Sequence, residues 1–356
     1  MFSVLLFGQW RTYNFKMIND NTIRELTNKY LESFDIWTRF RGKTFLITGV
    51  NGTLGKGLVS LLYFADLKYD LGITIYGSTR NPNLSSEYNS LKYIQYGNEE
   101  NELCNHHIDY IVHAACPTDR NDFIKSPNQV FLTIIHDTER MLRIARKKNA
   151  KMLYLSSDAE YGSWSADHPI CESEFGAIDS LNYRSCYPLG KKASEYMCYS
   201  DYYENKSSIV IARPSIIFGL FQRYEDTKVM SFFLRCIIEK KDIELNTLGE
   251  TIKPMIFTLD AANACLFLLL YGKEGEVYNI TNDKICMSIR DYAETLCKQF
   301  GDGIKVKYNI LTDAKAGFAA TSKLALDINK AISIGWRPLI GFIEMFDIEV
   351  RRFCSR

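Results

Sequence analysis

A tyrosine and a lysine, Tyr187 and Lys191, stand four residues apart near the middle of the chain and could form a reactive pair. Four residues apart, their side chains lie on one face of a helix. A phenol with a pKa of about 10 is a poor base at neutral pH, but a neighbouring ammonium group stabilises its anion. Such a pair can pass a proton to or from an alcohol or carbonyl oxygen while a hydride moves at carbon. Isolated tyrosine–lysine pairs at this spacing also occur by chance, so the neighbouring motifs decide whether this pair is catalytic.

The second chemical motif is a glycine-rich turn between a predicted strand, Thr44–Thr48, and a predicted helix, Lys56–Phe64. Its glycines let the backbone approach a pyrophosphate, and the start of the helix supplies unpaired N–H groups and partial positive charge. We therefore expect a dinucleotide cofactor at this turn. The residues predicted to contact it here are Gly49, Gly52, Thr53, Leu54 and Gly55.

The second predicted strand ends without the acid that an NAD-preferring site carries for the ribose hydroxyls. Its last residues include Ser78 and Arg80. A hydroxyl and a guanidinium complement a 2′-phosphate, so both residues are predicted to bind the cofactor, and NADP is favoured over NAD. The alternative for Arg80 is a solvated loop arginine, and NAD stays open.

Short β-branched runs alternate with helical segments along the chain. This order predicts an α/β fold with a doubly wound parallel sheet, covered on both faces, that binds ligands at the carboxyl ends of its strands. The predicted strands are Thr44–Thr48, Ile73–Tyr76, Tyr110–Ala114, Met152–Ser156, Ile209–Ala212 and Val277–Ile280.

At 356 residues the chain is long for one hydrophobic core, so a main domain and a smaller one are expected. Residues 1–42 are assigned to an N-terminal extension with an amphipathic helix over Ile18–Phe40. Residues 43–220 are assigned to the dinucleotide-binding domain. Residues 221–356 are assigned mainly to a substrate-binding cap, with 255–285 returning to the first domain.

Composition excludes several other classes of protein. A net charge of +1 argues against nucleic acid or an anionic membrane as a partner. No apolar run approaches the roughly 20 residues that a membrane helix needs. The 10 cysteines stand singly, without zinc-ligand spacing, so no metal is expected and a reduced, cytoplasmic protein is predicted. Met17 could equally be the natural start, because the residues before it carry no pattern.

Further segments fall in the same order as the motifs of a known family. The segment Asp109–Ala115 resembles a fourth-strand DxVxHxAA signature, Ser156–Gly162 resembles SSxxxYG, and Tyr187–Lys191 resembles YxxxK. Ile211–Pro214 and Glu276–Asn279 occupy further expected places. Between Gly42 and Trp336 the chain thus resembles the extended short-chain dehydrogenase/reductases, in their sugar-nucleotide epimerase/dehydratase/reductase group. This resemblance implies a Rossmann-type domain with a smaller C-terminal substrate-binding cap.

The resemblance also assigns roles to individual residues. Tyr187 would be the acid/base, and Ser157 would hydrogen-bond the reacting sugar oxygen. Lys191 would hold the nicotinamide ribose as well as stabilising the phenolate. The remaining predicted contacts are Ala114, Ala115, Tyr187 and Lys191 for the cofactor, and Ser157, Asp158, Arg213 and Lys253 for the nucleotide-sugar substrate. A homodimer through the helix of the tyrosine is also implied.

Departures from the family pattern narrow the expected reaction. Ala159 stands where dehydratases and decarboxylases carry a glutamate base, and alanine cannot carry a proton. Glu160 is displaced by one position, and in an extended segment it would point to the opposite face. Lys253 replaces the arginine of a Gly-x-Thr-x-Arg segment that reaches the nucleotide phosphates, which keeps the charge but loses the bidentate fork.

These observations favour a reductase that uses NAD(P)H to reduce a nucleotide-linked 4-keto-(6-deoxy)sugar, in surface polysaccharide or deoxysugar biosynthesis. An NAD-dependent nucleotide-sugar 4-epimerase is the alternative. A non-catalytic cofactor-binding protein is a further alternative, since fold alone does not establish function. Such a protein would not need Tyr187, Lys191 and Ser157 together.

Overall fold

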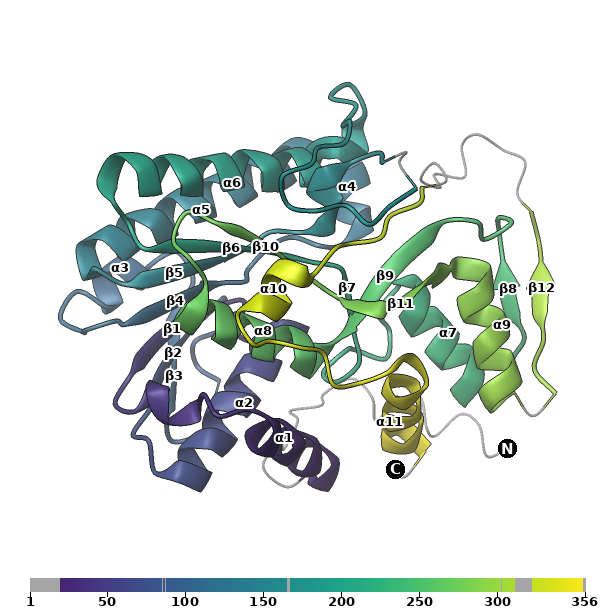
Figure 1. Cartoon of the computed structure of the whole chain (residues 1–356), viewed down its shortest axis with the longest axis horizontal. Coiled ribbons are helices and arrows are strands. Elements are labelled where there is room, and N and C mark those ends of the chain that lie inside the picture. Colours follow the sequence, from purple (N-terminus) through teal and green to yellow (C-terminus); the bar gives the residue numbers. More distant parts are fainter. Residues whose placement is uncertain are drawn as a thin grey trace.

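The computed structural model describes residues 20–84, 86, 88–164, 167–301, 303–310 and 322–354. A central sheet of seven strands, all paired in parallel, organises the fold (Figure 1). In spatial order its strands are β10 (Val277–Ile280), β6 (Ile209–Pro214), β5 (Lys151–Leu155), β4 (Tyr110–His113), β1 (Thr44–Thr48), β2 (Thr74–Thr79) and β3 (Leu91–Gln95). The strand order reverses between β1 and β4. A crevice for ligands is expected outside the carboxyl ends of these two strands.

Helices cover both faces of the sheet, so its strands are apolar on both sides. In β1, Phe45 and Ile47 belong to the core shared with α2 (Thr53–Tyr69) and α8 (Thr258–Tyr271). Leu46 points the other way, into the core shared with α5 (Pro127–Lys148) and α6 (Cys186–Asn205). The short helices α3 (Glu99–Glu102) and α4 (Arg120–Lys125) lie beside these two on the second face (Figure 1).

Close packing of α2 on α8 depends on a glycine. A Cβ added at Gly57 would lie 3.1 Å from Cγ2 of Thr258 and 3.3 Å from Cβ of Ala262. The absent side chain lets the two helices approach, which fixes the helix that follows the glycine-rich turn.

The smaller part of the structure lies beyond the end of the central sheet (Figure 1). A three-stranded sheet there has the order β11-β9-β7, and a two-stranded parallel sheet joins β12 to β8. Its elements are β7 (Ile216–Phe218), α7 (Val229–Ile238), β8 (Ile243–Leu245), β9 (Ile252–Phe257), β11 (Asn282–Ser288), α9 (Ile289–Phe300), β12 (Val306–Tyr308) and α11 (Phe342–Cys354). The short α10 (Asn329–Ser333) packs instead on β10 of the large sheet. Between β9 and β11 the chain returns to the large sheet as α8 and β10.

The leading helix is shorter than the sequence predicts. α1 (Asn21–Ser33) begins after Asp20, which caps it by accepting a hydrogen bond from the backbone N–H of Ile23. It ends at Phe34, whose backbone is extended, and a 3₁₀ helix, η3 (Trp37–Phe40), follows. The predicted single helix over Ile18–Phe40 is therefore wrong in extent, and its first two residues lie outside the described residues.

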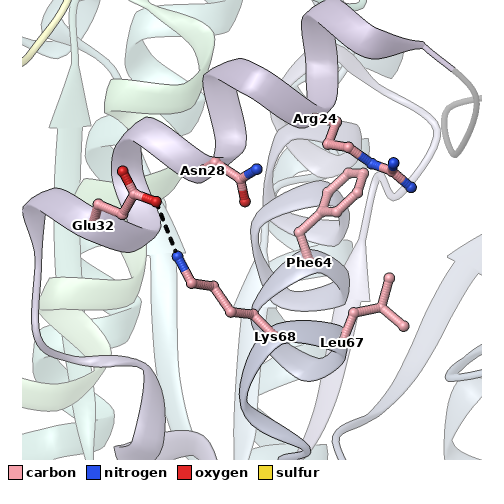
Figure 2. Close-up of a pocket in the computed structure, with 6 residues that line it drawn as sticks. All are labelled: Arg24, Asn28, Glu32, Phe64, Leu67 and Lys68. Atoms are coloured by element: carbon pink, nitrogen blue, oxygen red, sulfur yellow. Dashed lines mark hydrogen bonds and ion pairs between the residues drawn. The ribbon is translucent and has the colours of Figure 1, made fainter.

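An open groove of about 370 Å³ runs between α1 and α2 (Figure 2). Lys68 bridges it with an ion pair to Glu32, 3.2 Å long. The groove meets α2 from Phe64 onward, roughly 16 Å or more along the helix from its start at Thr53. It is therefore remote from the glycine-rich turn. No helix in the described ranges is both long and apolar enough to cross a membrane.

Candidate active site

The glycine-rich turn after β1 lies directly against the end of β4. Gly49 has a φ of +67°, and a Cβ on it would lie 2.9 Å from both Cα and N of Ala115. A Cβ on Gly55 would lie 2.3 Å from the carbonyl oxygen of Gly49. Both positions need glycine, since any side chain would collide with backbone. The structure thus brings the turn and Ala115 together at the point where the strand order reverses.

The start of α2 offers the N–H groups that an anion needs. Gly52 is the N-cap of this 17-residue helix and has no side chain to bond the first-turn N–H groups. Thr53 opens the helix and Leu54, the next residue, is buried. A tight turn, a close backbone approach and an uncapped helix start are the features that fit the pyrophosphate of a dinucleotide.

A buried histidine fixes the ends of β1 and β4 beside this turn. The Thr48 hydroxyl lies 2.8 Å from Nδ1 of His113 and accepts a 3.0 Å hydrogen bond from the backbone N–H of Ala115. Burial, with smaller effects from Lys191 and Arg140, lowers the pKa of His113 to about 3. The ring is therefore neutral at physiological pH and acts as a structural hydrogen-bonding group.

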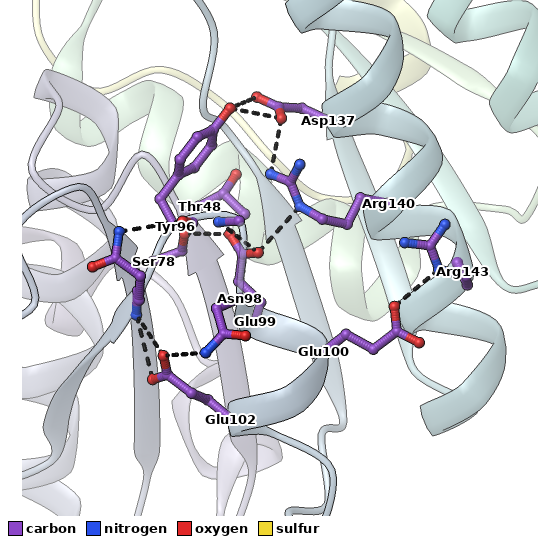
Figure 3. A network of polar contacts seen from close by, with 12 residues as sticks. Thr48, Ser78, Tyr96, Asn98, Glu99, Glu100, Glu102, Asp137, Arg140 and Arg143 are labelled. Atoms are coloured by element: carbon purple, nitrogen blue, oxygen red, sulfur yellow. Dashed lines mark hydrogen bonds and ion pairs between the residues drawn. The ribbon is translucent and has the colours of Figure 1, made fainter.

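The end of β2 differs from the sequence prediction (Figure 3). Ser78 is buried, and its hydroxyl donates a 2.6 Å hydrogen bond to Oε1 of Glu99. Oε2 of Glu99 accepts bonds from the backbone N–H of Gly97, at 3.0 Å, and from Nε of Arg140, at 3.1 Å. Of the two side chains expected at a 2′-phosphate, the structure turns Ser78 inward and leaves Arg80 exposed.

The buried Glu99 is part of a polar network that joins α5 to the segment after β3 (Figure 3). Arg140 also forms a 2.8 Å ion pair with Asp137, and the Tyr96 hydroxyl donates to Asp137 at 2.8 Å. Burial, reinforced by Asp137, raises the pKa of Tyr96 and keeps the phenol protonated as a donor. This network holds in place the edge of the sheet where the adenosine end of a dinucleotide would lie.

The three predicted catalytic residues lie together, across the carboxyl end of β5 and the start of α6. Lys191 is buried, and its Nζ donates a 2.6 Å hydrogen bond to the carbonyl oxygen of Leu155. The same Nζ is 5.8 Å from the centre of the Tyr187 ring. Ser157 follows β5, and its side chain lies close enough to the Tyr187 hydroxyl to lower the pKa of that phenol. The helical spacing that brings Lys191 under Tyr187 also points both toward the strand ends.

The Tyr187 phenol lies in an apolar setting. Its ring stacks on Phe123 of α4, with ring centres 5.3 Å apart. Burial raises the pKa of Tyr187 well above its usual value; Cys116 and Asp158 contribute in the same direction, and the hydrogen bond with Ser157 opposes them. The phenol is thus protonated at neutral pH.

A short 3₁₀ helix, η4 (Asp158–Tyr161), follows Ser157 and sets the directions of its neighbours. Ser157 caps it by accepting a 3.1 Å hydrogen bond from the backbone N–H of Ala159. The expectation of an extended segment is therefore wrong here. Glu160 nevertheless points away from Tyr187, into a buried cluster where Arg213 is 2.9 Å and Lys192 is 3.5 Å from it. Glu160 therefore does not take the place of the glutamate that Ala159 replaces.

Arg213, predicted to bind substrate, lies in that same buried cluster. Its Nη2 is 2.6 Å from Glu195 of α6, and its Nη1 donates to the carbonyl oxygen of Glu172. The side chain is 5% exposed, so its guanidinium is committed to protein carboxylates. The structure does not bring Arg213 to Tyr187. Instead, the Arg213 side chain links β6 to Glu195 of α6 and to Glu160 of η4.

Asp158 and Lys253, the other predicted substrate contacts, face each other. Lys253 lies on β9, and its Nζ is 3.9 Å from Oδ2 of Asp158. Asp158 Oδ1 accepts a 3.2 Å hydrogen bond from the Ser157 hydroxyl. The smaller part of the structure thereby reaches the residues predicted to be catalytic.

Two residues near the site were missed by sequence reasoning. Glu99 gives no signal, because it lies 21 residues from its partner Ser78 in a polar stretch. Cys116 directly follows the DxVxHxAA segment and packs in the same apolar cluster as Tyr187, a position that its place in the motif could have revealed. Burial raises the pKa of the Cys116 thiol, so it is protonated beside Lys191. In the described part of the chain, no three His, Cys, Asp or Glu side chains form a metal site.

Known proteins with similar sequences are sugar-nucleotide enzymes. UDP-glucuronic acid decarboxylase 1 of Xenopus tropicalis is 25% identical over 266 residues, which are 72% of this chain and 61% of the relative. UDP-glucuronic acid decarboxylase 6 of Arabidopsis thaliana is 24% identical over 302 residues, 84% of this chain and 85% of the relative. The chain thus spans about three fifths of the Xenopus relative's length and most of the Arabidopsis one.

Solved structures share the fold at low identity. UDP-glucose 4-epimerase of Thermotoga maritima, solved with UDP-glucose, has a TM-score of 0.75 at 18% identity, over 88% of this chain and 99% of that one. dTDP-glucose 4,6-dehydratase of Bacillus anthracis, in complex with NAD, has a TM-score of 0.71 at 18% identity, over 87% and 97%. These likenesses establish the Rossmann-like fold that the alternation of strands and helices and the family resemblance predict. The model of the NAD dependent epimerase/dehydratase family matches residues 45–281, well over half of the chain, and the chain belongs to that family.

Proposed function

We propose that this protein is a reductase of a nucleotide-linked 4-keto-(6-deoxy)sugar. The observation that carries the proposal is the catalytic set itself: Ser157, Tyr187 and Lys191 are together, while the glutamate position holds Ala159. Reducing a carbonyl needs one proton donor at oxygen. Dehydration or decarboxylation needs a further base beside an adjacent carbon, and Glu160, the residue after Ala159, is held by Arg213.

The electrostatics of Tyr187 support the reducing direction. Burial keeps the phenol protonated, as a group must be that gives its proton to a carbonyl oxygen. Ser157 is placed to hydrogen-bond the same oxygen. Lys191, 5.8 Å from the ring, stabilises the phenolate left after transfer. A bound nicotinamide would supply the hydride.

For the cofactor we propose NADP(H). Arg80 is exposed at the end of β2, where a 2′-phosphate would lie, and Glu99, the acid nearest to Ser78, is turned into the protein. A guanidinium binds a phosphate dianion well, and the segment directly after β2, Arg80–Leu84, contains no acid to repel it. Ser78 is buried and donates its hydrogen bond to Glu99, so the proposed phosphate contact is with Arg80.

A nucleotide-sugar 4-epimerase is the second candidate. The observation favouring it is the short distance between Lys191 and the Tyr187 ring, because a stabilised phenolate can also remove a proton and so begin with oxidation of the sugar. An epimerase would keep its cofactor through each turnover, whereas a reductase would consume one reduced cofactor.

One assay tests the proposal. The full chain is incubated with NADPH and either an unmodified nucleotide-linked hexose or its 4-keto-6-deoxy form, with dTDP, GDP, UDP and CDP as the nucleotide. The proposal expects NADPH absorbance to fall with at least one keto sugar and with none of the unmodified hexoses. Turnover of an unmodified hexose without net loss of NADPH would contradict the reductase and favour the epimerase.

A further inference from the structure

The carboxylate of Asp158 has one oxygen that is not hydrogen-bonded. Oδ1 accepts from Ser157 at 3.2 Å, but Oδ2 is buried and accepts no hydrogen bond from the part of the chain that the structure describes. The residue as a whole is 8% exposed. A buried acceptor without a donor is costly, so this oxygen favours a ligand that brings a proton to it.

The cation nearest to Oδ2 does not fill that role. Lys253 Nζ is 3.9 Å from Oδ2, which is an ion-pair distance and too long for a hydrogen bond. Lys253 is fixed on β9, opposite Met287 of β11, and its backbone carbonyl accepts from Tyr292. Its side chain is 23% exposed. The ammonium group of Lys253 and the carboxylate of Asp158 are therefore at ion-pair distance, while Oδ2 of Asp158 still lacks a hydrogen-bond donor.

The pair lies close to the reacting groups. Asp158 directly follows Ser157, to which it is hydrogen-bonded, and Ser157 in turn contacts Tyr187. Whatever sugar carbon is presented to Tyr187 must therefore place neighbouring substituents near Asp158. A hydroxyl there can donate to Oδ2. A carboxylate there cannot donate, and it would share the single cation of Lys253 with Asp158 in a partly desolvated site, where like charges repel strongly.

We propose that Asp158 is a specificity-determining residue that admits an uncharged sugar and rejects a uronate. The inference rests on the proposed function, since it requires a nucleotide sugar in this site. The decarboxylase relatives are named for UDP-glucuronic acid, and the inference predicts that this chain binds such a uronate poorly.

Matched pairs of ligands test the inference, because UDP-glucose and UDP-glucuronic acid differ at one carbon, as do GDP-mannose and GDP-mannuronic acid. Their dissociation constants for the full chain, with NADP⁺ present, are measured by titration calorimetry. In at least one pair the uncharged sugar should bind tenfold or more tightly. Asp158→Asn should reduce the ratio severalfold by strengthening the uronate, because Lys253 becomes free to pair with it.

Two controls locate the effect. Asp347→Asn removes the same charge from an exposed ion pair on α11 and should leave the ratio unchanged. Lys253→Gln in the Asp158→Asn background should abolish the gain in uronate affinity. Cofactor binding and circular dichroism verify that each variant is folded.

The outcomes separate the two claims. Equal or tighter binding of the uronate to the unaltered protein, or an unchanged ratio in Asp158→Asn, would overturn the role of Asp158 while leaving a nucleotide-sugar enzyme in place. Failure of every uncharged nucleotide sugar to bind would instead contradict the proposed function, and this inference with it.

Discussion

The Ser78 hydroxyl donates a 2.6 Å hydrogen bond to the carboxylate of Glu99, and both residues are buried, at 3% and 0% exposure. The hydrogen bond thus holds the Ser78 side chain inside the protein at the end of β2. Arg80 at the same strand end is exposed, so we expect the two residues to have separable effects on cofactor binding.

Arg80→Ala should weaken NADPH binding tenfold or more and leave NADH binding nearly unchanged, because the guanidinium is placed to neutralise a 2′-phosphate. Ser78→Ala is the matched control. It should cost roughly 1–3 kcal/mol of stability, since Glu99 loses a buried donor, without changing the preference between cofactors. Fluorescence titration of both nucleotides gives the ratio. Equal loss for NADH and NADPH in Arg80→Ala would remove the case for NADP.

Tyr187→Phe should fold, bind cofactor and lose roughly 10²–10⁴-fold in kcat, because only the proton-transferring hydroxyl is removed. Tyr196→Phe makes the same change on an exposed residue of the same helix, 71% exposed, and should keep full activity. Steady-state kinetics on the true substrate compares the two. Near-normal turnover in Tyr187→Phe would mean that the catalytic set is wrongly assigned.

Arg213→Met should act on stability. Removing the guanidinium leaves Glu195 and Glu160 buried without their shared cation, a loss of about 3–5 kcal/mol in comparable buried pairs. Denaturant unfolding should show this loss, partly recovered in Arg213→Met/Glu195→Gln. A large rise in KM with unchanged stability would instead restore Arg213 as a substrate contact.

Stability should also depend on pH through Asp260. This buried carboxyl of α8 accepts hydrogen bonds from the Tyr30 hydroxyl, at 2.8 Å, and from the backbone N–H groups of Leu339 and Ile340. Burial raises its pKa to about 7, although those three hydrogen bonds lower it. Between about pH 4 and 7 the unfolded chain therefore ionises this group while the folded chain keeps its proton, so the contribution to stability falls as pH rises.

Asp260→Asn should flatten the pH dependence of the unfolding free energy across that window, by about 4 kcal/mol at most. Urea unfolding at several pH values measures it. Tyr30→Phe should destabilise the protein at every pH by roughly 0.5–1.5 kcal/mol, the net value of one hydrogen bond. An unchanged pH profile in Asp260→Asn would show that the group is already ionised when folded.

Much of the fold could be predicted because buried parallel strands are continuous apolar runs. β1 and β10 have the predicted bounds, and the parallel sheet follows from the same alternation of strands and helices. β3 was missed because its sequence, LKYIQ, at the sheet edge has a half-exposed pattern. The cap strands, many of only three residues, lack any periodicity to detect.

The site was predictable where residues close in sequence share a helix face, as Tyr187 and Lys191 do. It was not predictable where direction depends on distant partners. Ser78 turns inward because Glu99 and Arg140 lie beneath it, and Arg213 turns inward because Glu195 lies on α6. The sequence predicts the direction of the Glu160 side chain from an extended backbone, whereas the backbone here forms a 3₁₀ helix that Ser157 caps.

The central claim, reduction of a nucleotide-linked keto sugar, is tested most directly by the mass of the product formed with NADPH that carries deuterium at the transferred position. A reductase with this catalytic set transfers deuteride to carbon and a proton to oxygen, so the product carries one deuterium on carbon and one NADPH is consumed for each molecule formed. A product that has lost water, or an isomer of equal mass without deuterium, would contradict it.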